Sequence, residues 1–184
     1  ELLGQHGAKV SHLKFENVRV PKENLIGKEN EGFKVLMDEL DRERGCIAAQ
    51  ALGYARTPFE AAIKYSNERS QFDKKIKSFE GVSFKIAEAA MRIEAAKLMT
   101  LEAARMLDKG VPATKQATMA KVYSTETAFE VSSNALQIMG GIGYTREYPV
   151  ERMLRDSRLM MIGGGTAEVL RFLIQREIYK EFGY

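Results

Sequence analysis

The sequence is poor in the residues that build disulfides and metal sites. Its 184 residues include one cysteine, Cys46, and two histidines, His6 and His12. A single cysteine can form no disulfide within the chain and cannot supply a multi-cysteine metal site. On an extended strand the two histidines would stand roughly 20 Å apart, too far to share one ion. We therefore expect no metal site, and a Cys46 that is a buried, reduced thiol.

Long apolar runs and a strong charge imbalance are also missing. No apolar run approaches the ~20 residues that a membrane span requires, and no signal peptide opens the chain. The formal net charge of +3 is too small to indicate a nucleic-acid-binding face. A hydrophobic content of 45% and a charged content of 29% are typical of a folded globular domain. We expect a protein of the cytoplasm, or of the mitochondrial matrix in a eukaryote.

The first thirty residues read differently from the rest. Residues 10–20, VSHLKFENVRV, place apolar side chains at close to every second position and predict a strand or a strand pair. Pro21 ends this run, and residues 22–32 form a polar, glycine-containing connector. One or two strands cannot make a stable sheet alone. Because the chain also begins at Glu1 rather than at methionine, we expect it to be part of a longer polypeptide.

Everything after the connector has helical periodicity. Apolar residues recur at helical spacing from Phe33 onward, and Pro58 should kink or divide this first helix. A second helix is predicted over 79–107. Its apolar side carries Phe84, Met91, Leu98 and Leu101. Further helices are predicted over 113–139, 149–155 and 166–182. Long helices joined by short loops predict a mainly α fold, an antiparallel helical bundle.

Two charged motifs are candidates for chemistry. The first is LDRER at 40–44, in which Glu43 could be a general base or simply part of a solvated charged face. The second is ERSQFDKKI at 68–76. Here Arg69 beside Phe72 could hold a phosphate against an aromatic surface, because the arginine fork bonds two oxygens at once. A plain surface arginine would look the same.

Two glycine-rich motifs are equally open to two interpretations. QIMGGIGY at 137–144 contains the pair Gly140–Gly141, which suits a helix C-cap or a close approach of the backbone to a ligand. IGGGTAEVLR at 162–171 places glycines and Thr166 before a helix. This arrangement suits an anion at the helix N-terminus, although Thr166 is also a good N-cap without any ligand.

The order and spacing of these motifs resemble the acyl-CoA dehydrogenase family from about Leu13 to Tyr179. The matching segments, in family order, are FENVRVPKENLIG, LDRER, ERSQF, QIMGGIGY, RMLRDSRLMMI and GGGTAEVLR. GGxGY followed a little over twenty residues later by GTxE is the most specific pair. The resemblance implies that residues 1–28 are the end of the family's middle β-domain with its connector, and that residues 29–184 are its C-terminal helical bundle domain.

The resemblance also implies an activity. Family members bind FAD and an acyl-CoA thioester, usually as homotetramers, and convert the thioester to a trans-2-enoyl-CoA. A glutamate removes the α-proton while the β-hydride goes to the flavin, and the electrons usually leave through an electron-transferring flavoprotein. The 184-residue chain alone is expected to be inactive. The alternatives are an enoyl-CoA reductase or an acyl-CoA oxidase of the same fold, or a non-catalytic helical assembly module.

Residue roles follow from the motif matches. Many members carry the base in a YEGT-like motif, where this chain has Gly164; a minority, including isovaleryl- and long-chain-type enzymes, carry it in the LDxER helix at the position of Glu43. The resemblance places Asp41, Arg44, Gly164 and Gly165 at the substrate. It places Arg69, Phe72, Gln137, Gly140, Gly141, Thr166 and Glu168 at FAD.

Two residues depart from the family pattern at the flavin. Asp73 stands where a glycine is common after RxxF, and Glu80 stands where many members have a glutamine near FAD. A carboxylate at position 80 would repel the pyrophosphate if it pointed toward it.

Overall fold

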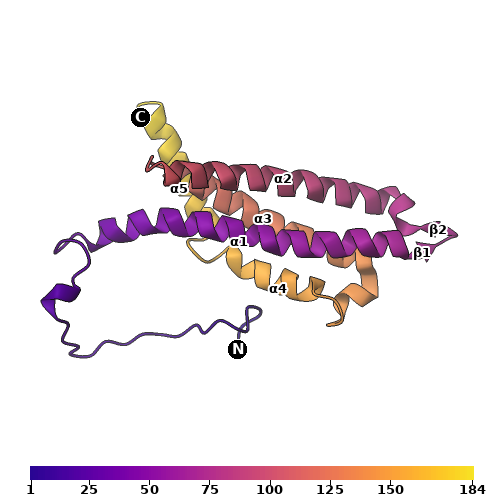
Figure 1. Ribbon diagram of the computed structural model, residues 1–184, viewed down its shortest axis with the longest axis horizontal. Helices are drawn as coiled ribbons and strands as arrows, with labels where there is room; N and C mark the ends of the chain where they lie inside the picture. Colours follow the sequence, from indigo (N-terminus) through magenta and orange to yellow (C-terminus); the bar gives the residue numbers. More distant parts are fainter.

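The computed structural model describes all 184 residues and consists mainly of five helices (Figure 1). They are α1 (Gly32–Glu68), α2 (Glu80–Asp108), α3 (Thr114–Met139), α4 (Val150–Met160) and α5 (Ala167–Glu181). Three short 3-10 helices, η1 (Lys22–Asn24), η2 (Ile76–Ser78) and η3 (Gly140–Tyr144), join or precede them. The only sheet is the hairpin of β1 (Ser70–Gln71) and β2 (Lys74–Lys75). The predicted mainly α, antiparallel bundle is confirmed.

Helix α3 is the centre of the bundle. It packs against α1, α2, α4 and α5, whereas α1, α2 and α3 run side by side in alternating directions (Figure 1). Half of its residues are buried, and most of these are alanine, serine or threonine. Such small side chains let neighbouring helices approach closely, since the distance between helix axes depends on the side chains at the contact.

The core itself is built largely from alanine. Ala51 and Ala55 of α1 meet Ala89 of α2 and Ala128 and Val131 of α3 in one buried cluster. A second cluster nearer the start of α1 joins four more buried alanines. These are Ala48, Ala103, Ala117 and Ala120. The three long helices are therefore in contact mainly through the one-carbon side chains of alanine.

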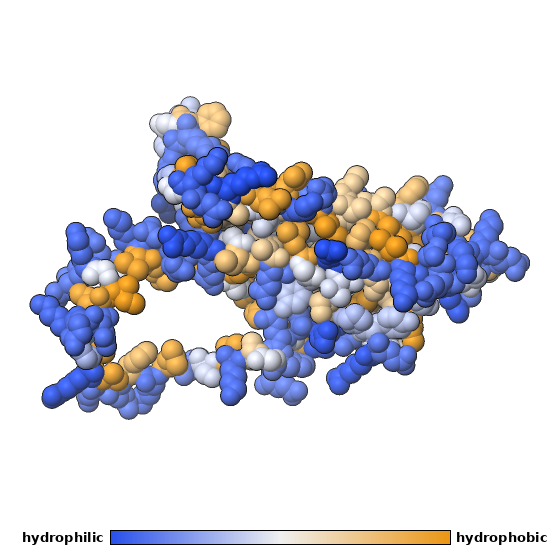
Figure 2. Space-filling model, viewed as in Figure 1, coloured by the Kyte–Doolittle hydropathy of each residue, from blue (hydrophilic) through white to orange (hydrophobic).

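The large apolar residues of α2 lie on the outside, which corrects the predicted orientation of this helix. Phe84 and Met91 are each 64% exposed and Leu98 is 57% exposed. Apolar surface lies over the part of the bundle where α2 runs (Figure 2). The periodic stripe of large residues is real, but alanines on the opposite side of α2 make the close contact with α1 and α3, so the stripe faces away from this core.

Pro58 does not divide α1, which continues unbroken for 37 residues. Proline cannot donate the helical hydrogen bond to the carbonyl four residues earlier, here Tyr54. The hydroxyl of Ser132 on α3 lies 3.5 Å from that carbonyl oxygen. A side chain of the central helix thus approaches the acceptor that the proline leaves free.

The predicted strand over residues 10–20 is absent, and that prediction was wrong. These residues have no regular secondary structure, and Leu13 and Phe15 are 80% and 76% exposed. A strand needs a partner for its backbone groups, and no neighbouring strand lies in this chain. Cys46 is exposed rather than buried, which corrects a second expectation. None of the helices has the length and apolarity needed to cross a membrane.

The alanine contacts lead to a stability prediction. Ala51 is completely buried, whereas Ala49 on the same helix is exposed. Ala51→Leu should lower the free energy of unfolding by about 1–3 kcal/mol or more, because the added carbons must push the helices apart. Ala49→Leu should change it by less than about 0.5 kcal/mol. Urea unfolding followed by circular dichroism measures both; equal effects of the two substitutions would contradict the close packing.

Candidate functional site

The predicted site residues gather in two groups at opposite ends of α1. One group contains Glu43 near the start of the helix and the glycines at 163–165. The other surrounds Arg69, the residue that follows the end of the helix. Between Glu43 and Glu68, 25 residues of helix span about 38 Å at 1.5 Å per residue. The two groups are therefore two separate sites on this chain.

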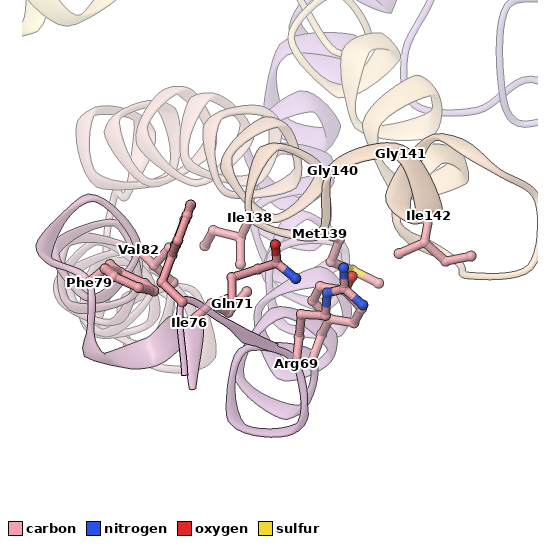
Figure 3. A pocket seen from close by; sticks show the side chains of 12 residues that line it. Arg69, Gln71, Ile76, Phe79, Val82, Ile138, Met139, Gly140, Gly141 and Ile142 are labelled. Carbon is pink, nitrogen blue, oxygen red and sulfur yellow. The ribbon is translucent and has the colours of Figure 1, made fainter. Parts of the chain in front are cut away.

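A cleft of about 800 Å³ lies at the end of α1, beside the β1–β2 hairpin. Four of the predicted cofactor residues line it. They are Arg69, Phe72, Gly140 and Gly141. Figure 3 shows Arg69 and Gln71 on the hairpin side and the Ile138–Gly140 segment, the end of α3, facing them. Gln137, the fifth predicted residue of this group, is exposed one turn before Gly140 and does not line the cleft.

The hairpin is tight because two consecutive residues adopt left-handed backbone angles. Phe72 has a φ of 51° and Asp73 a φ of 58°, as in the type I′ turn of two-residue hairpins. Aspartate tolerates left-handed backbone angles better than most residues. Asp73 can therefore occupy a position where glycine is common in the pattern that the sequence resembles. The turn leaves the Phe72 ring 85% exposed, edge-on to Phe79 at 6.3 Å between ring centroids.

The cleft fits a group that is part aromatic and part anionic. Eight of its twelve lining residues are hydrophobic, and the Arg69 guanidinium forms no ion pair within the chain. Gly140, with a φ of 63°, exposes backbone without a side chain, and a Cβ there would meet nothing within 4 Å. Glu80 does not line the cleft; it begins α2, where a carboxylate is favoured by the helix dipole.

The other group brings α1 together with the turn between α4 and α5. An added Cβ on Gly164 would lie 2.6 Å from Cδ1 of Ile47. Ile47 is one helical turn after Glu43, so both side chains project from the same side of α1. Glu43 is exposed there. Gly164, to which the resemblance assigns the usual position of the base, therefore lies next to the face of α1 that carries Glu43.

Asp41 and Arg44 bind to each other and to α3. Nη1 of Arg44 donates to Oδ1 of Asp41 at 2.9 Å, and the hydroxyl of Thr114 donates to Oδ2. The side chains are 18% and 8% exposed. They tie α1 to the start of α3, and the predicted contact with the substrate remains a prediction.

Lys121 is a residue of this site that the sequence interpretation missed. It is fully buried on α3, and its Nζ donates to the carbonyl oxygen of Gly165 at 2.7 Å. The pKa of this amine is lowered to about 8, chiefly by burial and then by the nearby Arg44, against the attraction of Glu126, Glu168 and Glu43. The sequence signal that could have identified Lys121 is a lysine among the small residues of the helix predicted over 113–139.

Thr166 and Glu168 form the start of α5. The Thr166 hydroxyl accepts from the backbone N–H of Val169 at 3.4 Å and is the N-cap of the helix. Hydrogen bonds from its own backbone N–H and from Thr166 lower the pKa of Glu168, and Arg171 and Arg158 lower it further. Both residues therefore have a capping role within the chain, and their contact with a cofactor remains a prediction.

Comparison with known proteins identifies the family. The model of the acyl-CoA dehydrogenase C-terminal domain matches residues 30–179. The chain is 44% identical over 178 residues to the probable acyl-CoA dehydrogenase YngJ of Bacillus subtilis, covering 97% of this chain and 47% of that protein. It is 43% identical to subunit CarC of the caffeyl-CoA reductase-Etf complex of Acetobacterium woodii, with the same coverage of both.

A solved structure agrees with both matches. Butyryl-CoA dehydrogenase from Megasphaera elsdenii superposes with a TM-score of 0.95 at 40% identity, over 97% of this chain and 47% of that one. The chain belongs to the acyl-CoA dehydrogenase family, and it spans about half the length of these relatives.

The buried amine leads to a prediction about pH. The pKa of Lys121 is about 8 in the folded chain, against 10.5 for an ordinary lysine. Between these values the unfolded chain binds more protons, so this residue's contribution to stability rises with pH, by up to about 1.4 kcal/mol per pH unit. The difference in unfolding free energy between the native chain and Lys121→Met should therefore grow in favour of the native chain from pH 8 to 10.5. A flat difference across this interval in urea titrations would show that the amine titrates normally.

Proposed function

We propose that this chain is the helical half of an FAD-dependent acyl-CoA dehydrogenase in which Glu43 is the base that removes the α-proton. When bound, FAD would supply the acceptor for the β-hydrogen, which would leave as hydride. The product would be a trans-2-enoyl-CoA. Family membership supports the reaction class, and the residues around Glu43 support the assignment of the base.

The observation that carries the proposal is the contact between Gly164 and Ile47. A base must reach the α-carbon of the substrate, and the family's usual base position has no side chain in this chain. Gly164 lies directly against the residue one turn after Glu43. The Ile47 side chain fills the space that a side chain at position 164 would need, and Glu43 projects from the same side of α1 one turn earlier. A surface glutamate without a function would not need to lie one turn from the residue that contacts Gly164.

In this mechanism the chain's residues have distinct tasks. Glu43 accepts the α-proton, and Gly164 lets the turn between α4 and α5 pack against Ile47 beside it. Arg44 and Asp41 fix α1 against α3 through their ion pair, so that Glu43 projects from a rigid element.

The two sites imply two flavins and more than one subunit. At about 38 Å along α1, the Glu43 group and the Arg69 cleft are too far apart to hold one cofactor between them. We place the acyl group and the flavin of this subunit at the Glu43 end. The Arg69 cleft would then receive the adenosine and phosphate part of a neighbouring subunit's FAD, with its cation on the phosphates and its apolar walls on the rings. This arrangement supports a homo-oligomer, a tetramer by resemblance to the family.

The same residues would serve the reverse reaction. Proton transfer at the α-carbon is reversible, so in an enoyl-CoA reductase the protonated Glu43 would donate the α-proton as a general acid. One relative at 43% identity belongs to a caffeyl-CoA reductase-Etf complex. Because that relative is a subunit of an Etf complex, we propose an electron-transferring flavoprotein as the redox partner. A non-catalytic assembly module is the competing function, and it predicts that Glu43 is dispensable.

Replacement of the base separates these functions. Glu43→Gln in the complete flavoprotein should keep its flavin but lose about 10²–10⁴-fold in turnover, because the amide cannot accept the proton. Reduction of the flavin by an acyl-CoA, followed in a stopped-flow spectrometer, measures the step directly.

The matched control is Glu39→Gln. Glu39 is an exposed carboxylate one turn earlier on the same helix. Its replacement should leave turnover within about twofold, since surface substitutions away from a site have small effects. Near-normal flavin reduction in Glu43→Gln would reject Glu43 as the base, and equal losses in both variants would show a general effect of charge.

The 184-residue chain alone should fold but not hold flavin. Its helices bury their own core, whereas the contacts to a flavin are divided between two distant sites. Partial contacts must still offset an association cost of roughly 4–15 kcal/mol. We expect a helical, colourless, inactive protein that self-associates through exposed apolar surface such as that of α2. A stoichiometric flavin band in the visible spectrum of the purified chain would contradict this.

A further inference from the structure

The turn between α4 and α5, residues 161–166, is fixed by a single side-chain hydrogen bond to its backbone. That bond runs from Nζ of Lys121 to the carbonyl oxygen of Gly165, at 2.7 Å. Backbone bonds hold its two ends: the N–H groups of Ile162 and Gly163 donate to the carbonyl of Leu159 at 2.8 and 2.9 Å, and the N–H of Ala167 donates to the carbonyl of Met161 at 3.1 Å. We call residues 161–166 the glycine turn.

The glycine turn requires such an anchor because its backbone is intrinsically free. Gly164 and Gly165 have φ values of 65° and 105°, which side chains rarely adopt. Glycine loses more conformational freedom on folding than any other residue. Three consecutive glycines would therefore sample many conformations unless a contact from outside the turn selected one.

A lysine is a costly choice for this anchor. Lys121 is 0% exposed, and an amine in the interior is destabilised unless its hydrogen bonds are satisfied. Packing alone would favour an apolar residue of similar length, such as methionine. The polar end of Lys121 reaches the glycine turn and lies where Glu43, Glu168 and Arg44 all influence its charge. The residue thus connects the central helix to both sides of the proposed acyl site.

We propose that Lys121 is a positioning residue, which rests on the proposed function of Glu43. By holding the carbonyl of Gly165, it keeps the glycine turn at a fixed distance from the face of α1 that carries Glu43 and Ile47. The acyl group would lie beside this contact, next to Glu43. A loose turn would still admit the substrate but would present its α-carbon to the base in the correct geometry for a smaller fraction of the time.

The experiment compares Lys121→Met with Lys97→Met in the complete flavoprotein. Lys97 is an exposed lysine on α2 whose ion pair lies within that helix. Hydrogen–deuterium exchange should be at least tenfold faster at the amides of the glycine turn in Lys121→Met, with α1 and α3 unchanged. The kcat should fall at least tenfold while KM changes less than threefold and the flavin content stays stoichiometric. Lys97→Met should match the native enzyme in every measurement.

A second variant of Lys121, and the Glu43→Gln variant measured in parallel, make the outcome decisive. Lys121→Gln keeps a neutral donor on the same side chain position, so it should recover part of the lost protection even if Lys121→Met folds poorly. Native exchange rates in the glycine turn of both variants would overturn the proposal, as would faster exchange without any fall in kcat. Glu43→Gln measured in parallel should leave the exchange of the turn unchanged. Normal turnover in that variant would reject the base, while the exchange data would still report on the anchor by itself.

Discussion

The close contact of α3 with α1 and α2 is the constraint on which the other features of the structure depend. Alanines at the helix contacts, such as Ala51 and Ala128, bring the three helices together. Because the core takes up so little side-chain volume, the large residues of α2 must lie elsewhere, and they form an apolar outer face. An exposed apolar face of this kind is typical of a surface that contacts another domain or subunit.

The same packing makes α1 a rigid carrier of two sites. The helix is 37 residues long, and α3 supports it on one side, including at Pro58. Glu43 and Arg69 therefore remain at opposite ends at a fixed separation. A break in α1 would let the two groups of residues move independently. The hydroxyl of Ser132 near the Tyr54 carbonyl shows how the central helix accommodates a proline at this place.

Charge is distributed unevenly between the two sites. At the Arg69 cleft one unpaired guanidinium faces apolar walls, which suits a phosphate beside an aromatic ring. At the Glu43 end, Lys121 and Arg44 are buried close enough to lower the pKa of the lysine. Two buried cations in one region are unfavourable unless carboxylates lie near, and Asp41, Glu43 and Glu168 meet this need from α1 and α5.

Helical periodicity was sufficient to predict the five helices, most of them to within one or two residues of their ends. It predicted the helix at 149–155 too short, since α4 continues to Met160. It did not predict the hairpin after Arg69, because two short strands have no periodic signal. The strand expected over residues 10–20 failed for a different reason: its apolar alternation is present, but strand structure depends on a partner that this chain lacks.

The sequence by itself determined the family, the order of its motifs, and the absence of a side chain at Gly164 together with a glutamate at position 43. These are properties of short segments, and each can be recognised where it stands. Only the tertiary structure decided that Gly164 lies against Ile47 and that Lys121, 44 residues before Gly165, holds that residue's carbonyl. Such contacts join residues far apart in the chain, and the packing of α1 and the glycine turn against α3 determines which residues meet.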